Sequence, residues 1–241
     1  MNTSLKNSAS CPKARLTLSL LAASLLLVTA CTTTQKAPLN QADVNCAFLG
    51  SECALLIPGS KDQAALRYVN PAAQWTQYNK ILISPVTFWG GDTTKLSAAD
   101  QQMLVNFASQ EFNKQLGEKF QIVNQAGPGV MKIDVALTDA ETATAGLRSI
   151  SIIVPQAHAL ANLKYLATGS MPFVGAAQGE VKITDSVSGQ VLGMAVDKQI
   201  GGGSIKAGFQ WQWGDAENAI DHWAEVMATR LSAWTSGTAA P

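Results

Sequence analysis

Two stretches of the chain have apolar residues at helical spacing. The first follows Ser97, where Ser97–Asp100 resembles a capping box with aspartate in place of the usual glutamate. The second follows Asp215, which we expect to be an N-cap. The two apolar faces consist of Leu104, Phe107, Ala108, Phe112 and Leu116 in the first stretch, and of Ala219, Ile220, Trp223, Met227, Leu231 and Trp234 in the second. The spacing predicts an amphipathic helix that ends at Gly117 and a second one near the C-terminus.

Strand patterns flank the first of these helices. Residues 80–88 form a β-branched and aliphatic run, in which Pro85 cannot donate to a ladder and should mark an edge, a bulge or a strand end. Residues 120–123 are a short strand candidate, and Gly127–Gly129 predicts a turn. Residues 132–138 alternate between apolar and polar positions, as a half-buried strand does.

A hairpin is predicted closer to the C-terminus. Residues 180–185 and 190–198 have strand composition and are joined by Ser-Val-Ser-Gly. With the strands and helices above, this predicts an α+β fold: a single domain with a mixed or antiparallel sheet, two main amphipathic helices, and a C-terminal hairpin followed by a helix.

The segment 150–177 is apolar, with Lys164 as its only charge. One interpretation is a buried helix that completes the core. The other is a surface patch that docks a partner or lies on a membrane. A membrane span is disfavoured because Pro155 and several polar residues interrupt the segment.

The N-terminal pattern predicts a secretory signal peptide. Residues 1–15 carry three cations and no acidic side chain, and residues 16–28 are uncharged and apolar. The apolar run has about a dozen residues, fewer than the roughly 20 that span a bilayer core. A basic region, a short apolar region and small residues at a cleavage site are typical of secretory signals.

The end of this signal resembles a bacterial lipobox, Val28-Thr29-Ala30-Cys31. The resemblance implies cleavage before Cys31 and acyl chains, such as palmitate, on its thiol and new amino terminus. Two or three chains would hold the protein essentially permanently. Thr32, instead of an aspartate, implies the outer membrane with the domain facing the periplasm. The alternative is an ordinary secretory signal with a chance cysteine.

This interpretation divides the chain into four parts. Residues 1–30 are the cleaved signal, and residues 31–44 are the lipidated cysteine and a polar tether. Residues 45–235 are the periplasmic domain, and residues 236–241 are a flexible tail. The polar run 32–44, fully extended, would reach at most roughly 45 Å, so the domain could stand clear of the lipid headgroups.

The net charge of the mature chain bears on its expected partners. Without the three cations of the signal, 14 Lys and Arg face 17 Asp and Glu, a net charge of about −3 that argues against a nucleic-acid partner.

Cys46 and Cys53 remain after Cys11 is removed and Cys31 is acylated. An oxidising periplasm favours a disulfide between them. Two free thiols, or a metal or redox site, are the alternatives.

Candidate chemistry is sparse, so we expect no enzyme, no cofactor and no metal site. His158 lies in the apolar segment, and His222 should lie near solvent. Asp134, Asp139 and Glu141 could form a carboxylate cluster for metal or acid–base work, although Asp134 belongs to the polar face of its strand. The glycine-rich residues 201–208 lack the lysine of a phosphate-binding loop.

Aromatic residues beside glycines offer one possible ligand platform. Trp89 precedes two glycines, and Trp211 and Trp213 flank a glutamine. Such residues can bind sugars or peptides, although packing in the core is the commoner role of tryptophan.

Several short motifs, in their order and spacing, resemble an uncharacterised family of bacterial lipoproteins, DUF3313. They are Leu66-Arg67-Tyr68-Val69-Asn70-Pro71, Tyr78-Asn79-Lys80 leading to Pro85-Val86, Gly127-Pro128-Gly129-Val130 with Leu137-Thr138-Asp139, Phe173-Val174-Gly175, Val196-Asp197-Lys198 with Gly201-Gly202, and Trp213-Gly214-Asp215 with Asp221-His222-Trp223-Ala224. The resemblance implies a signal-anchored lipoprotein and supplies no catalytic residues. The pair Cys46 and Cys53 departs from the family pattern.

Together these patterns favour a lipid-anchored, non-enzymatic envelope lipoprotein that binds an envelope protein partner or supports envelope structure. The alternative is a lipoprotein that binds a small ligand or glycan through Trp89, Trp211 and Trp213.

Overall fold

The computed structural model describes residues 34–44, 46–90, 96–141, 175–201 and 213–241. Residues 32–241 form one compact unit, separate from residues 1–31. The apolar core clusters of the described residues begin at Ala37. We therefore expect residues 32–241 to fold without the N-terminal segment.

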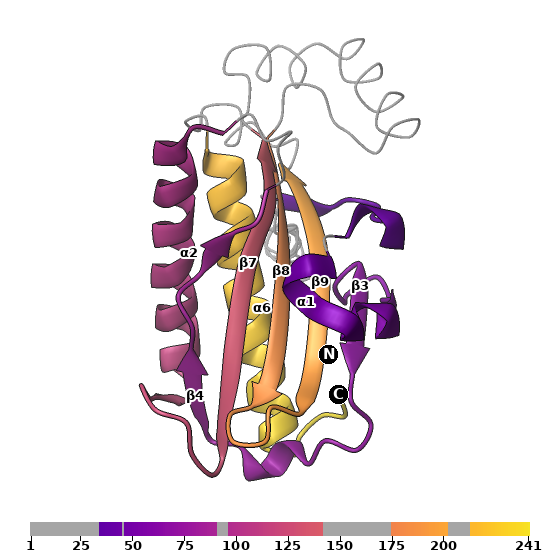
Figure 1. Cartoon of the computed structure of the whole chain (residues 1–241), viewed down its shortest axis with the longest axis vertical. Helices are drawn as coiled ribbons and strands as arrows, with labels where there is room; N and C mark the ends of the chain where they lie inside the picture. The colour runs from indigo at the N-terminus through magenta and orange to yellow at the C-terminus, as the bar shows by residue number, and fades with distance from the viewer. Residues whose placement is uncertain (1–33, 45, 91–95, 142–174, 202–212) are drawn as a thin grey trace, which may run out of the picture. The chain divides into compact units, whose positions relative to one another are not determined.

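Among the described residues, a nine-stranded mixed sheet is the centre of this unit (Figure 1). Its main path is β2-β3-β9-β8-β7-β4-β6, while β1 pairs with β9 and β5 pairs with β7. The strands are β1 Thr34–Lys36, β2 Ile57–Pro58, β3 Leu66–Val69, β4 Lys80–Ile83, β5 Thr87–Phe88, β6 Gln121–Ile122, β7 Val130–Glu141, β8 Ala176–Asp185 and β9 Val191–Gly201. The predicted α+β class is confirmed, and the predicted hairpin is the antiparallel pair β8–β9.

The two predicted amphipathic helices cover one face of the sheet (Figure 1). They are α2, Ala98–Gly117, and α6, Gly214–Thr235. Ser97 caps α2 as expected, since its side chain accepts a hydrogen bond from the Asp100 N–H. The N-cap of α6 is Trp213, so the prediction of Asp215 as N-cap is wrong. Asp215 is buried and accepts a hydrogen bond of 2.7 Å from the Gly175 N–H instead.

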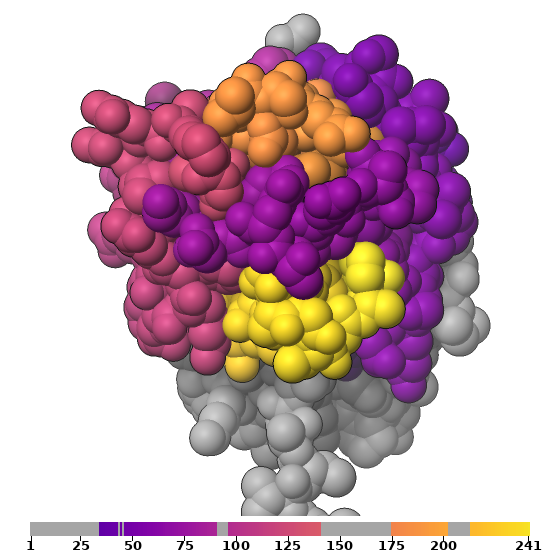
Figure 2. Space-filling view, turned by 90° about the horizontal axis from the view of Figure 1, so that it is seen from below, coloured from indigo at the N-terminus to yellow at the C-terminus, as the bar shows by residue number. Residues whose placement is uncertain are grey.

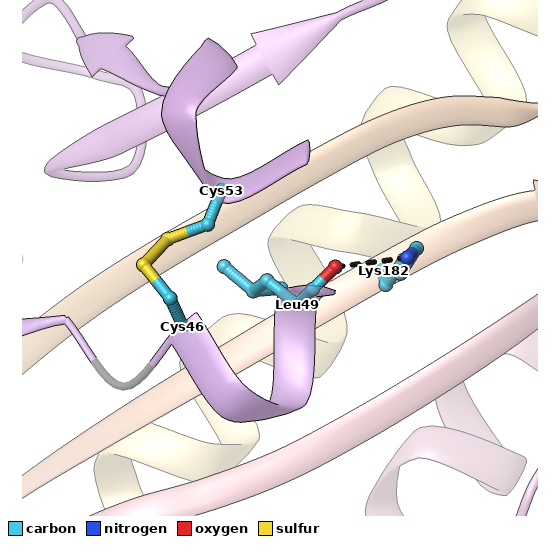
Figure 3. Close-up of a disulfide and its surroundings, with 4 residues drawn as sticks. All are labelled: Cys46, Leu49, Cys53 and Lys182. Carbon is cyan, nitrogen blue, oxygen red and sulfur yellow. Dashed lines mark hydrogen bonds between the residues drawn. A yellow bond between two sulfur atoms is a disulfide. The ribbon is translucent and has the colours of Figure 1, made fainter. Parts of the chain in front are cut away.

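The opposite face is covered by a short segment that a disulfide closes (Figure 3). Helix α1, Cys46–Leu49, is followed by the 3₁₀ helix η2, Gly50–Leu55, and Cys46 is bonded to Cys53. Lys182 Nζ on β8 donates to the Leu49 carbonyl at 2.8 Å. The buried Leu49 side chain packs in a second core cluster with Leu66, Met194 and Val196, among others.

Pro85 marks a strand end, as predicted: the run 80–88 is divided into β4 and β5, and Pro85 lies in the break. Two further expectations need correction. The expected tether is not free along its length, because β1 pairs with the end of β9 and Ala37 is buried. Within the segment 150–177, residues 150–174 lie outside the described residues, and the last two residues belong to β8 and not to a helix. In the described part of the chain, no helix is long and apolar enough to cross a membrane.

Candidate ligand-binding groove

A groove of about 850 Å³ lies between α6 and the sheet. Small-molecule sites usually enclose about 300–1,000 Å³, so this volume suits a ligand of that size. Side chains from β3, β7, β8, β9 and α6 contribute to its lining, together with β1 and residues 61–64.

Small residues lie in the sheet under the groove. Three rows of residues cross the strands on this face: Leu137, Gly179 and Asp197; Val135, Val181, Ala195 and Arg67; and Ile133, Ile183, Gly193 and Val69. Each row contains one glycine or alanine on β8 or β9. The rings of Trp223 and Trp75 pack near Gly179 and Gly193, and the small Ala195 side chain leaves space in the row between them. Val181, Ala195 and Val69 are consequently only half-buried, although they lie inside the sheet.

Helix α6 supplies the opposite wall. Its side chains Trp223, Val226 and Met227 line the groove and are half-buried. The Trp223 indole lies on Gly179, where an added Cβ would be 3.0 Å from Cζ3 of the ring. These three side chains make the α6 wall of the groove largely apolar.

A tryptophan pair joins η3 to α6 near the joined ends of β8 and β9. Trp75, in the 3₁₀ helix η3 Trp75–Gln77, packs against Trp234 of α6 with 5.0 Å between ring centroids. The Trp75 ring also lies near Gly193. Figure 2 shows the η3 region, in violet, between the β8–β9 hairpin in orange and the C-terminal residues in yellow. Of the two rings, Trp234 lines the groove.

Asp197 organises the polar corner of the groove. Its buried carboxylate accepts hydrogen bonds from the Ala65 N–H at 2.8 Å, from Gln199 Nε2 at 2.6 Å and from Trp223 Nε1 at 2.9 Å. These bonds join the start of β3, β9 and α6. This carboxylate already accepts three hydrogen bonds from N–H groups within the fold, so we assign Asp197 a structural role.

Two arginines line the groove from opposite walls. Arg67 lies on β3 beside Ala195, and Arg230 lies on α6, where it donates to the Asp62 carbonyl. Burial lowers the pKa of the Arg67 guanidinium, and the positive charge of Arg230 lowers it further. Within the described ranges, neither arginine forms an ion pair with a carboxylate.

The predicted tryptophan platform is not assembled as expected. Trp89 is 40% exposed and contacts the Phe48 ring. Trp213 is only 3% exposed and donates to Asp100 Oδ1 at 3.1 Å, so its face is not available to a ligand from solvent. Trp211 lies outside the described residues.

The other candidate polar residues lie apart from the groove or at its rim. Asp134 pairs with Lys132 at 2.8 Å and Asp139 with Lys198 at 3.5 Å, while Glu141 ends β7. His222 is exposed at the rim of the groove, and His158 lies outside the described residues. Over the described ranges, no group of three His, Cys, Asp or Glu side chains could hold a metal ion.

Sequence patterns did not identify Arg67, Asp197 or Arg230 as site residues. Arg230 follows Met227 by three residues and precedes Trp234 by four, so it lies on the apolar stripe of α6. A cation on such a stripe is the signal that could have revealed it. Arg67 and Asp197 have no comparable signal, because their position depends on the pairing of β3 with β9.

A family model described as "Protein of unknown function (DUF3313)" matches residues 47–227. No curated protein matches the chain in sequence.

Several solved structures share a low similarity with the chain. PelC of Paraburkholderia phytofirmans, which was solved as a dodecamer, is 10% identical with a TM-score of 0.37, over 66% of this chain and 94% of PelC. A DUF330 protein of Xanthomonas campestris is 10% identical with a TM-score of 0.36, over 71% and 94% of the two chains. A DUF4136 protein of Bacteroides thetaiotaomicron is 9% identical with a TM-score of 0.32, over 70% and 95%. No property of these proteins transfers to the chain at such scores.

Proposed function

Because the chain belongs to DUF3313, a family of proteins of unknown function, we propose its function from the groove: it is a non-enzymatic envelope lipoprotein that binds an apolar ligand between α6 and the sheet. The proposal includes an acyl anchor at Cys31 and an outer-membrane location with the domain facing the periplasm. The anchor is supported by the basic and apolar N-terminal segments and by Val28-Thr29-Ala30-Cys31.

The observation that carries the ligand-binding role is the half-exposed apolar lining inside the fold. Val181 and Ala195 lie on central strands, where a close-packed domain would cover them with helix side chains. Gly179 and Gly193 also line the groove, on either side of the Ala195 row. An apolar ligand would remove this surface from water, at about 25 cal/mol per Å² of apolar area.

The test is a binding measurement with the neutral probe N-phenyl-1-naphthylamine, which fluoresces more strongly in apolar surroundings. We expect residues 32–241 to bind it and the variant Ala195→Trp to lose at least tenfold in affinity, because the indole would fill the groove. Ala126→Trp, on an exposed turn, is the matched control and should bind as the wild type does. Equal binding by all three proteins would contradict the proposal, provided that circular dichroism shows each to be folded.

A second candidate function, binding of an envelope protein partner, is favoured by one surface feature. Leu55, at the end of η2, and Ile57, the first residue of the edge strand β2, are 47% and 63% exposed. Exposed apolar side chains at a sheet edge can pair with another chain. Photocrosslinking from position 57 in intact envelopes tests this role, and the absence of any crosslinked protein would count against it.

A further inference from the structure

The two arginines at the apolar groove indicate what kind of ligand it takes. This inference rests on the proposed function, because it concerns the same groove. We infer that the ligand is a single-chain amphiphile with an anionic headgroup, whose tail lies between α6 and the sheet and whose headgroup is bound by Arg67 and Arg230.

The sheet places a charged group directly beside the apolar floor. Arg67 is the neighbour of Ala195 in the β3–β9 ladder, and Ala195 is the neighbour of Val181 in the β8–β9 ladder. The row therefore changes from aliphatic to small to cationic across three adjacent strands. An amphiphile has the same order of chemistry, a hydrocarbon chain that ends in a polar group.

The charges on the two walls have the same sign. Arg67 is half-buried, and the charge of Arg230 disfavours the charged form of Arg67. Bringing two guanidinium groups together in a partly dry site costs free energy unless an anion lies between them. Carboxylate and phosphate groups fit guanidinium donors in a bidentate geometry, so an anionic headgroup would remove this repulsion.

The carboxylate residues that line the groove are Asp62, Glu180 and Asp197, and within the described part of the chain none of them forms an ion pair with Arg67 or Arg230. Asp197 is engaged with three N–H donors, from Ala65, Gln199 and Trp223. Arg230 is bound to a backbone carbonyl, that of Asp62, which carries no formal charge. Among the described residues, the Arg67 guanidinium donates no hydrogen bond to another side chain. Its five N–H donors match the oxygen atoms of an acidic headgroup.

The experiment compares probes that share a tail and differ in charge. Dodecanoate and dodecyltrimethylammonium are titrated, each below its critical micelle concentration, into residues 32–241 by isothermal calorimetry. We expect dodecanoate to bind at least tenfold more tightly than the cationic probe. The double variant Arg67→Gln/Arg230→Gln should lose this preference, while Lys119→Gln, which removes an exposed cation just after α2, should retain it.

The outcomes separate this inference from the proposed function. If the double variant still binds N-phenyl-1-naphthylamine but no longer prefers dodecanoate, both are supported. If the wild type binds the two dodecyl probes equally, the inference of an anionic headgroup is wrong, and the proposal of an apolar ligand in the groove stands. If no probe binds, both fail. A dimer that Ala195→Trp abolishes would assign the groove to a second copy of the chain and overturn the inference.

Discussion

At the scale of single residues, Asp197 shows how one polar group determines the packing of three elements. It lies on β9 in the same row as Gly179, under the Trp223 indole. Its carboxylate accepts hydrogen bonds from the start of β3, from β9 and from α6. One side chain therefore ties these three elements together.

We predict that Asp197→Asn lowers the free energy of unfolding by about 1–3 kcal/mol. The asparagine amide replaces one acceptor oxygen with a donor, which then faces N–H groups that need an acceptor. Urea-induced unfolding followed by circular dichroism at pH 7 measures the effect.

Asp62→Asn is the control for this variant, because the Asp62 side chain is exposed. Its midpoint should stay within about 0.5 kcal/mol of the wild type in free energy. An unchanged midpoint for Asp197→Asn would show that the three hydrogen bonds contribute no net stability.

At the scale of elements, the segment 46–55 is short but covers part of one face of the sheet. It covers the face of β3 and β9 that the long helices do not reach, and its buried residues Leu49 and Cys53 pack on Met194. A segment of ten residues cannot form a stable helix alone in water. The disulfide and the bond from Lys182 to the Leu49 carbonyl hold it on the sheet (Figure 3).

We predict that Cys46→Ser/Cys53→Ser lowers the free energy of unfolding by about 2 kcal/mol, because the unfolded chain gains the freedom that the small closed loop removes. Denaturant unfolding of residues 32–241 is the measurement. Dithiothreitol should destabilise the wild type by a similar amount and leave the variant unaffected. If the variant equals the oxidised wild type in stability, the disulfide does not hold the segment.

The elements that could be predicted from the sequence are those long enough to show several repeats of the helix or strand period. Helix α2 and the β8–β9 hairpin have long amphipathic patterns, and both were found near their expected boundaries. Strands β1, β2 and β3 have two to four residues, too few to show a period. The groove was not predictable, because it arises where Gly179, Ala195 and Gly193 are brought under α6 by strand pairing. The Asp215 error has the same origin, since a helical pattern does not show that Gly175 lies nearby.

At the scale of the whole molecule, the proposed anchor determines where the protein works. We predict that the full-length wild type is found in the outer-membrane fraction with a mature mass that begins at Cys31 plus acyl chains. Cys31→Ala should be absent from that fraction. Membrane fractionation and intact mass spectrometry test this, and a soluble, unacylated wild type would remove the anchor from the proposal.

The pairing of β1 with β9 limits the distance between Cys31 and the start of the folded domain. Thr34 pairs with Gly201 and Ala37 donates to the Lys198 carbonyl, so the domain begins three residues after Cys31. Three residues span at most roughly 11 Å. Under the proposed anchor at Cys31, a domain so close to its lipid would keep its groove, which β1 helps to line, near the membrane that holds it. We would then expect the protein to bind lipids of that membrane and not to carry them across the periplasm.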